Sequence, residues 1–339
     1  MILYFVGFLP VLVLLILLAS LALITDHKSA RETPLNTVLS KVLLPREGFV
    51  GGLWRESELV SVSDLQSVRD KLRGGGWKIL RDEYEMFVNR NSHNFAASAC
   101  LEFPFQKTLI LRLMGTDIHE TQADFPRSME LLKDAPFHSM SFYMMDGKSE
   151  LAPHRGVFSG SLRYHMALSV PSDANEGNLE SEIINSLLPS GPSLPKTRFV
   201  ICDKDMSTFS AGQTGDSGCS QPSDWSVHPW KEGHDFVFDE MDTHYAVQGS
   251  PDPRLIFLAD FPRPNLNWWW RVLLHGVVWG LMPRLDSINV YARTYSKHLQ
   301  LLKDRKKWTD NEFHIMCAMM MLGDVDDWAE GITLTEPET

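Results

Sequence analysis

The sequence predicts a mainly β protein of the sandwich or jelly-roll type, with flanking helices and an N-terminal transmembrane helix. Two observations carry this prediction. From about residue 96 the chain is a succession of short strands separated by Gly, Pro, Ser and Asp clusters. At the N-terminus, an uncharged run from Met1 to Ile24 is long enough to cross a bilayer core of about 30 Å.

The N-terminal run is interpreted as an uncleaved anchor over residues 1–25. The alternative is a signal peptide, because Ser20-Leu21-Ala22 resembles a cleavage site. However, the apolar run is longer than the roughly 7–15 residues usual in a signal, and no basic residue precedes it. Lys28 and Arg31 follow the run, so the positive-inside rule predicts a single-pass protein with its globular part in the cytosol.

Composition excludes some partners and leaves the redox compartment open. The chain has 339 residues and a net charge of −11, and the absence of a basic patch argues against nucleic acid as a partner. The four cysteines are too scattered for a zinc site or a dense disulfide framework. A bridge between Cys202 and Cys219 stays possible in an oxidising lumen.

The chain divides into four predicted segments: the anchor at 1–25, a tether and helical lead-in at 26–95, a β domain at 96–265, and a Trp-rich segment with C-terminal helices at 266–339. Within the lead-in, a helix is expected from Ser63 until Gly74-Gly75-Gly76 ends it. The strands expected in the β domain are Thr108–Met114, Ser139–Met145, Ser161–Val170, Thr197–Cys202, Asp235–Asp239 and Arg254–Asp260.

Three further segments surround these strands. The polar stretches 172–195 and 206–224 are predicted surface insertions. The apolar cluster from Trp268 to Met282 is too short and too polar to span a membrane. It is either a helix at the bilayer interface or a helix buried against the β domain. A last helix is expected near Thr309.

Two strands carry polar groups that suit a binding cavity. In the strand from Ser161, apolar residues occupy one face, whereas Arg163 and His165 point to the other. Arg254 begins an apolar strand, where an unpaired buried guanidinium would be costly. A carboxylate ligand that is bound bidentately would remove that cost. The alternative is that both arginines are ordinary surface charges.

Between residues 139 and 265 the chain contains an ordered set of short motifs. In chain order they are His154-Arg155-Gly156, Arg163-Tyr164-His165, Trp230-Lys231-Glu232-Gly233, Phe238-Asp239-Glu240, His244 and Arg254. This set resembles the aspartyl/asparaginyl β-hydroxylase family of Fe(II)- and 2-oxoglutarate-dependent dioxygenases, which includes lipid A hydroxylase-like members.

The resemblance implies a double-stranded β-helix with iron bound by His154 and His244. It further implies that Arg254 binds the distal carboxylate of 2-oxoglutarate, that Arg163 and His165 face its metal-proximal end, and that O2 is the oxidant. Ser141 is the candidate for the family's serine on the strand before the first histidine.

Gly156 stands where most related oxygenases have a carboxylate ligand. The family named here also lacks that carboxylate. Water, Asp242 or Asp239 would then complete the iron shell.

Three functions remain open at this stage. The first is hydroxylation of a lipid acyl chain or another membrane-proximal substrate, because the Trp-rich segment after Asp260-Phe261-Pro262-Arg263-Pro264 looks like the lipid A hydroxylase ending. The second is peptidyl aspartyl/asparaginyl β-hydroxylation. The third is a non-catalytic, membrane-tethered binding protein that keeps the fold without turnover.

Overall fold

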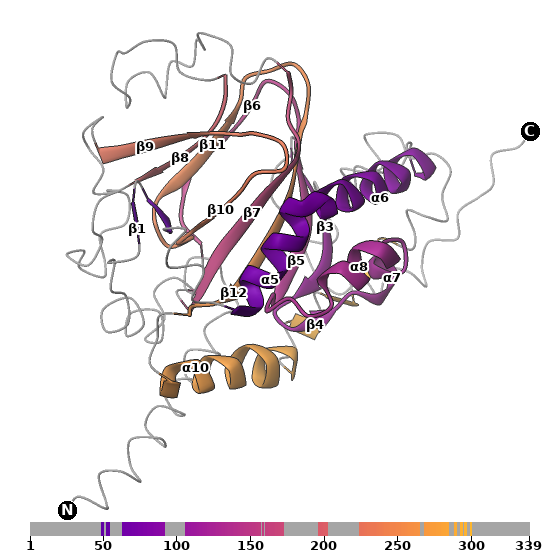
Figure 1. Ribbon diagram of the computed structural model, residues 1–339, viewed down its shortest axis with the longest axis vertical. Helices are drawn as coiled ribbons and strands as arrows, with labels where there is room; N and C mark the ends of the chain where they lie inside the picture. Colours follow the sequence, from indigo (N-terminus) through magenta and orange to yellow (C-terminus); the bar gives the residue numbers. More distant parts are fainter. Residues whose placement is uncertain are drawn as a thin grey trace, which may run out of the picture.

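The computed structural model describes residues 49–54 apart from 51, 63–91, 106–172 apart from 157 and 159, 196–202, 224–264, 268–284, and short stretches between 288 and 299. These residues form two antiparallel sheets with helices against one of them (Figure 1).

The larger sheet has eight strands in the order β1-β2-β10-β7-β12-β5-β3-β4. The smaller sheet has four, in the order β6-β11-β8-β9. The bounds in chain order are β1 Phe49–Val50, β2 Leu53–Trp54, β3 Gln106–Leu113, β4 Thr116–Asp117, β5 Ser139–Met145, β6 Ser149–His154, β7 Ser161–Ser169, β8 Thr197–Cys202, β9 Trp225–Pro229, β10 Asp235–Phe238, β11 His244–Gln248 and β12 Arg254–Pro262.

Strands β5 to β12 have jelly-roll topology. Along the chain they pass between the larger sheet, where they stand in the order β10-β7-β12-β5, and the smaller one. The predicted mainly β, jelly-roll fold is therefore confirmed for this part of the chain. The predicted anchor at 1–25 lies outside the described residues, and no described helix is long and apolar enough to cross a membrane.

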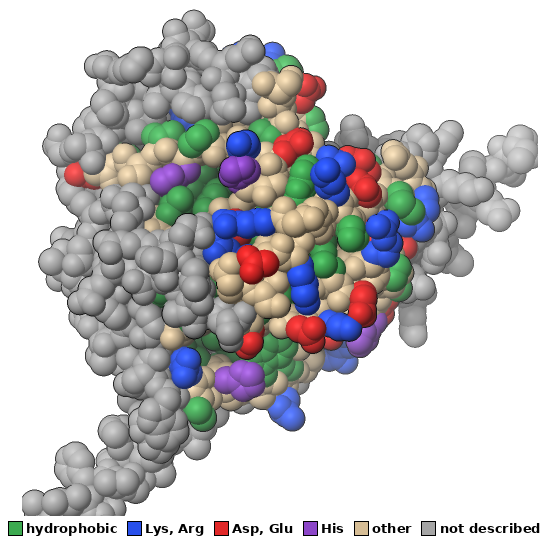
Figure 2. All heavy atoms as spheres, in the orientation of Figure 1, with side chains coloured by type: hydrophobic (Ala, Val, Ile, Leu, Met, Phe, Trp, Pro, Cys, Tyr) green, Lys and Arg blue, Asp and Glu red, His purple; other side chains and the backbone are tan. Residues whose placement is uncertain are grey.

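One face of the larger sheet is covered by helices (Figure 1). They are α5 Ser63–Lys71, the π-helical turn η2 Leu72–Gly76, α6 Trp77–Arg90, α7 His119–Gln122 and α8 Pro126–Leu132. The expected helix end at the glycines is a kink, because Gly75 has φ +115° and a new helix begins at Trp77. Acidic and basic side chains are interspersed on the face of the molecule that Figure 2 shows. One ion pair of α6 is Arg81–Asp82.

Aromatic packing holds the helices on the sheet. Phe142 of β5 lies 5.3 Å from Tyr84 of α6 and 4.8 Å from Phe125, measured between ring centroids. Phe137 stacks on Tyr164 of β7. All of these side chains are buried, so this layer is the main hydrophobic core of the molecule.

The strand β7 alternates as its sequence predicts. Leu162, Tyr164, Met166 and Leu168 enter the helix-side core. Arg163 and His165 must therefore point to the opposite face. A second hydrophobic cluster lies on that face and combines residues from both sheets, including Phe199, Ile201, Trp230, Phe238 and Ile256. The interior between the two sheets is thus the place where Arg163 and His165 can act.

The Trp-rich segment forms the helix α10, Trp268–His275, followed by the π-helical turn η6 Gly276–Leu281 and the 3-10 turn η7 Met282–Arg284. Leu274, Val277 and Val278 are buried. Val272, in contrast, is 60% exposed. The segment packs on the β domain through one side, as a buried helix would, and leaves another side exposed; contact with a bilayer stays a prediction.

Several predicted features lie outside the described residues. They include nearly all of the two insertions, 172–195 and 206–224, and the helix near Thr309. Cys202 is described, fully buried and disulfide-bonded, and its partner cysteine belongs to the part of the chain that is not described.

Candidate functional site

Two histidines meet between adjacent strands of the smaller sheet. His154 is the last residue of β6 and His244 is the first residue of β11. They are direct cross-strand partners, and their ring centroids lie 4.3 Å apart. Side chains that are paired in this way project from the same face of the sheet. Two imidazoles from distant parts of the sequence can therefore bind one metal ion.

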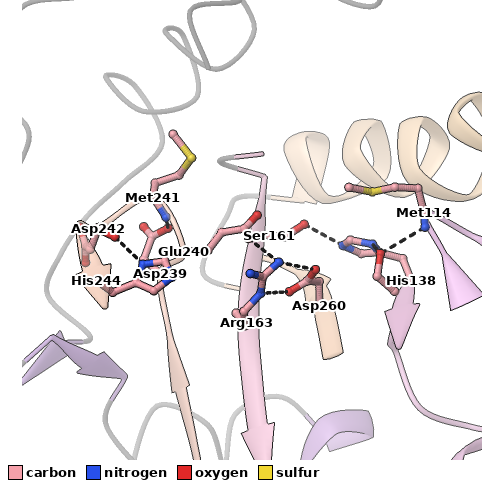
Figure 3. A network of polar contacts seen from close by, with 11 residues as sticks. Met114, His138, Ser161, Arg163, Asp239, Glu240, Met241, Asp242, His244 and Asp260 are labelled. Atoms are coloured by element: carbon pink, nitrogen blue, oxygen red, sulfur yellow. Dashed lines mark hydrogen bonds and ion pairs between the residues drawn. The ribbon is translucent and has the colours of Figure 1, made fainter. Parts of the chain in front are cut away.

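One ring nitrogen of His244 is hydrogen-bonded to the backbone, so the other nitrogen is the one that can bind a metal. Its Nδ1 lies 2.8 Å from the backbone oxygen of Asp242 (Figure 3). A carbonyl oxygen only accepts, so Nδ1 carries the proton and Nε2 keeps its lone pair. Burial, and after it the nearby His154, hold the pKa of His244 well below its usual value. The neutral ring is the form that binds a metal.

Gly156 has no room for a side chain, and Glu240 is the reason. A Cβ on Gly156 would lie 2.3 Å from Cδ of Glu240. The two residues also share a backbone hydrogen bond of 2.6 Å from the Gly156 amide to the Glu240 oxygen. The carboxyl group of Glu240 thus occupies the space that a carboxylate two residues after His154 would need.

The acidic residues near the histidines have other partners. Asp239 accepts hydrogen bonds from the guanidinium of Arg263 and, at 3.0 Å, from the backbone amide of Met241. Among the described residues, no three His, Cys, Asp or Glu side chains are arranged to hold a metal ion. A metal at this site would therefore take two imidazoles from the described part of the chain.

Arg163 is matched by two carboxylates of the protein itself. Its Nε and Nη2 donate to Asp260 at 2.7 and 3.0 Å, and its Nη2 lies 2.5 Å from Glu240 (Figure 3). Burial raises the pKa of Glu240 to about 7 and the neighbouring Asp260 and Asp239 also raise it, although Arg163 opposes the shift. Arg163 therefore connects Glu240 with Asp260, and its place at the metal-proximal end of the cosubstrate stays a prediction.

Arg254 has the opposite surroundings. Its side chain is 1% exposed, and Nε and Nη1 have no hydrogen-bond partner among the described residues. Nη2 lies 3.4 Å from the sulfur of Met145, which is a weak acceptor, and the guanidinium lies 4.4 Å from the Trp230 ring. Burial lowers the pKa of Arg254 to about 10. The cation is thus enclosed, and no carboxylate among the described residues pairs with it.

His165 lies close to Arg254, on the same side of the larger sheet. It is buried, its ring stacks on Trp230 at 5.7 Å between centroids, and neither ring nitrogen has a partner among the described residues. Burial, followed by the charges of Arg163 and Arg254, holds the pKa of His165 well below its usual value. The His165 ring and the Arg254 guanidinium are therefore neighbours, and both have nitrogen atoms without a hydrogen-bond partner among the described residues.

Ser141 lies on β5, between Ile110 of β3 and Leu258 of β12. It is 7% exposed. By strand alternation it projects from the same face of β5 as Tyr143 and Met145, of which Met145 contacts Arg254. The hydroxyl is therefore on the side of the sheet that holds Arg254 and His165.

Sequence reasoning missed Glu240 and Trp230 as parts of the site. The Phe238-Asp239-Glu240 motif contains Glu240, but the candidates for the metal were Asp239 and Asp242. Trp230 opens another motif and contacts both His165 and Arg254. A signal for Glu240 exists in the sequence, since the glycine at 156 implies that something else fills that space.

One of the comparisons with known proteins identifies a family. The family model described as aspartyl/asparaginyl beta-hydroxylase matches residues 75–183 and 213–264. Those two segments include every site residue that the sequence predicts, from Ser141 to Arg254. No curated protein matches the chain.

Solved structures resemble the fold only distantly. The epimerase SnoN from nogalamycin biosynthesis is 14% identical, with a TM-score of 0.28, over 49% of this chain and 66% of its own. The chain thus spans less than two thirds of SnoN. An oxidoreductase of the 2OG-Fe(II) oxygenase family from Burkholderia pseudomallei is 10% identical, with a TM-score of 0.26, over 48% and 69%. These likenesses are too low to carry an argument.

Proposed function

Since this chain belongs to the aspartyl/asparaginyl β-hydroxylase family, we propose that it is an Fe(II)- and 2-oxoglutarate-dependent hydroxylase. The single observation that carries the proposal is the enclosed guanidinium of Arg254, two of whose donor nitrogens have no partner among the described residues. An unpaired buried cation is costly, and a carboxylate bound bidentately would satisfy it. 2-Oxoglutarate offers such a carboxylate at the end that does not bind the metal.

The residues present fit iron and the cosubstrate. His154 and His244 would hold the metal, and the Asp242 carbonyl fixes the His244 ring so that Nε2 is the free nitrogen. Arg254 would bind the distal carboxylate, with His165 and Ser141 on the same side of the cavity. When bound, iron and 2-oxoglutarate supply the O2-dependent oxidation that adds an oxygen atom to a substrate C–H bond.

The chain's own residues orient these groups and exclude water. The rings of Phe199 and Phe238 lie 5.7 and 5.0 Å from the His244 ring, between centroids. Trp230 covers the guanidinium of Arg254. Such an apolar enclosure strengthens the electrostatic attraction between Arg254 and a carboxylate.

A decarboxylation assay tests the proposed activity. Release of CO2 from 2-oxoglutarate is measured with the wild type, His154→Ala and Arg254→Ala. The wild type should release CO2 in an iron-dependent way, and both variants should lose most of it. Equal rates in all three would show that the site assignment is wrong. His154-dependent release would also exclude the non-catalytic binding protein.

For the substrate, we propose a lipid acyl chain or another membrane-proximal group. Two features support this: the uncharged run from Met1 to Ile24, which predicts an anchor, and the open side of α10 with Val272 exposed. A peptidyl aspartyl or asparaginyl side chain is the second candidate, and the name of the matched family favours it.

The disulfide at Cys202 favours an oxidising compartment over the predicted cytosolic side.

Untargeted lipid and peptide profiling for a mass gain of one oxygen separates the two substrates. Cells that express the wild type are compared with cells that express His154→Ala, Val272→Glu or Met86→Glu. Met86, on α6, is 53% exposed and serves as the matched control for Val272. A lipid substrate predicts less product with Val272→Glu alone, whereas a soluble peptide substrate predicts wild-type product with both glutamates.

A further inference from the structure

A short hairpin near the N-terminus reaches the predicted iron site from outside the segment that the family model matches. The hairpin consists of β1 and β2, residues 49–54, and the family match begins at residue 75. Leu53 of β2 pairs with Phe238 of β10, so the hairpin extends the edge of the larger sheet next to His244. No site residue was predicted in this region of the sequence.

The turn of the hairpin also touches the smaller sheet. Gly52 has φ +73°, a conformation that other residues rarely adopt. A Cβ at this position would lie 2.4 Å from Cγ2 and 3.1 Å from Cγ1 of Ile201 on β8. Position 52 therefore requires glycine for two reasons: the backbone angle is positive, and Ile201 leaves no space for a Cβ. Through this contact the hairpin spans both sheets.

Both contacts converge on His244. Ile201 is the cross-strand partner of His244 in the smaller sheet. Phe238 presents its ring edge to the His244 ring, with 5.0 Å between centroids and an interplanar angle of 68°. Leu53 packs against the hydrophobic cluster that contains Ile201 and Phe238. Ile201 and Phe238, two of the residues beside His244, thus both lie against the hairpin.

We propose that the hairpin is a positioning element of the iron site, in which Gly52 and Leu53 hold Ile201 and Phe238 against the imidazole of His244. The inference rests on the proposed function, because it assigns His244 to the metal. Outer residues that orient a metal-binding histidine typically change metal affinity by about 10- to 100-fold when they are altered. Small displacements of the ligand suffice, since a site must be held within about 0.5 Å of its working geometry.

Binding of Co(II), a spectroscopic substitute for Fe(II), tests the proposal. Gly52→Ala should weaken Co(II) binding by about 10- to 100-fold and change the visible d–d spectrum of the bound ion. Gly75→Ala is the matched control, because Gly75 also has a positive φ, +115°, but nothing lies within 4 Å of its Cβ position. It should lower the unfolding temperature and leave Co(II) affinity and spectrum unchanged.

A second substitution removes the clash and should restore the site. In Gly52→Ala/Ile201→Ala, the nearest remaining side-chain atom is the Cβ of residue 201, at 3.3 Å. Co(II) affinity should return to that of Ile201→Ala alone. Leu53→Ala removes the support of Phe238 without any clash and decides the question if Gly52→Ala does not fold.

The outcomes separate this inference from the proposed function. A wild type that does not bind Co(II) contradicts the metal site and the inference with it. A wild type that binds Co(II), with the affinity and spectrum unchanged in Gly52→Ala and Leu53→Ala, overturns the inference alone.

Discussion

Arg254 and Arg163 both lie between the two sheets, but their charges have different partners. Arg163 is neutralised by Asp260 and Glu240, so its position is fixed by the fold. Arg254 has a sulfur atom and an indole ring as neighbours, and two of its donor nitrogens are unmatched among the described residues. An anionic ligand would therefore stabilise the buried charge of Arg254, whereas the charge of Arg163 is already balanced.

Arg254→Met should therefore separate stability from binding. The free energy of unfolding should rise by about 1 kcal/mol or more, because an unpaired buried charge is replaced by an apolar side chain. Affinity for 2-oxoglutarate in the metal-loaded, anaerobic protein should fall at least about 30-fold, as expected when a buried charge partner is lost. Calorimetry measures the affinity, and chemical denaturation measures the stability.

Arg112→Met is the contrast, since Arg112 donates to Asp117 at 2.6 Å and to the Phe137 carbonyl at 3.0 Å. This variant should lose stability and keep 2-oxoglutarate affinity. A destabilised Arg254→Met with normal affinity would show that Arg254 is structural.

Gly156→Ala tests whether Glu240 fills the space beside the histidines. The new methyl group would lie 2.3 Å from Cδ of Glu240, so the free energy of unfolding should fall by about 1–3 kcal/mol, as is usual for overpacking. In a Glu240→Ala background the same substitution should have little effect. Gly276→Ala is the control, because nothing lies within 4 Å of its Cβ position. Equal stability of Gly156→Ala and the wild type would contradict the assigned packing.

At the scale of single elements, the longer strands of the larger sheet and β8 of the smaller sheet could be predicted, whereas β6, β9 and β11 of the smaller sheet could not. Ser139–Met145 has the predicted bounds because turn residues flank an apolar β-forming run. The strand β11 is buried at all five positions, so it has no alternation to detect. The strands β6 and β9 contain or end in proline, which argues against a strand in sequence-based reasoning.

This difference explains which parts of the site the sequence reveals. Arg163 and His165 lie on a predicted strand, so their orientation followed from alternation. Arg254 begins another predicted strand and was identified by the cost of burying its charge. The contact of His154 with His244 depends on the register of β6 against β11. Neither strand was predicted, so the histidines could be paired only through the family resemblance. The contact between Glu240 and Gly156 is likewise a product of tertiary packing.

Docking of α5 on the sheet depends on a buried ion pair. Nε of Arg69 lies 2.7 Å from Asp235 at the start of β10, and both side chains are buried. Asp235→Ala should lower the free energy of unfolding by about 3–5 kcal/mol, because it removes the carboxylate that pairs with the buried charge of Arg69. Asp82→Ala, which breaks an exposed pair with Arg81, should cost less than about 1 kcal/mol. Similar losses in denaturant titrations of both variants would contradict this role.

At the scale of the whole molecule, two sheets with different surroundings pack against each other through one shared cluster of side chains. The larger sheet is covered by helices on its outer face (Figure 1). The inner faces of both sheets meet in the cluster around Phe199 and Phe238. The rigid layers explain how buried charges such as Arg254 are retained, since the surrounding core fixes them in place. The sequence predicts this architecture from strand succession, whereas the closing hairpin at residues 49–54 was not foreseen.

Stability should decline in mild acid because of His138. This ring is fully buried between Ser139 and Ser161, at 3.1 and 2.7 Å (Figure 3), and burial lowers its pKa to about 4 from 6.5. The folded protein therefore binds fewer protons than the unfolded chain between these pH values. The contribution of His138 to stability is fully present above pH 6.5, and roughly 3 kcal/mol of it is lost as the pH falls towards 4.

His138→Gln can keep one hydrogen bond and cannot titrate. Denaturant titrations from pH 7 to pH 4 should give a shallower loss of stability for this variant than for the wild type. The difference between the two proteins is the relevant quantity, because Glu240, with its pKa raised to about 7, has the opposite dependence on pH. Parallel curves would contradict the contribution of His138.

The most direct test of the central claim is an anaerobic titration of the Fe(II)-loaded protein with 2-oxoglutarate, followed by the visible charge-transfer absorption of the chelate. The wild type should develop a saturable band. Arg254→Met should need at least about 30-fold more cosubstrate to reach it, and His154→Ala should not develop it. A wild type without the band, or a band with the same midpoint in Arg254→Met, would contradict the assignment of this cavity to iron and 2-oxoglutarate.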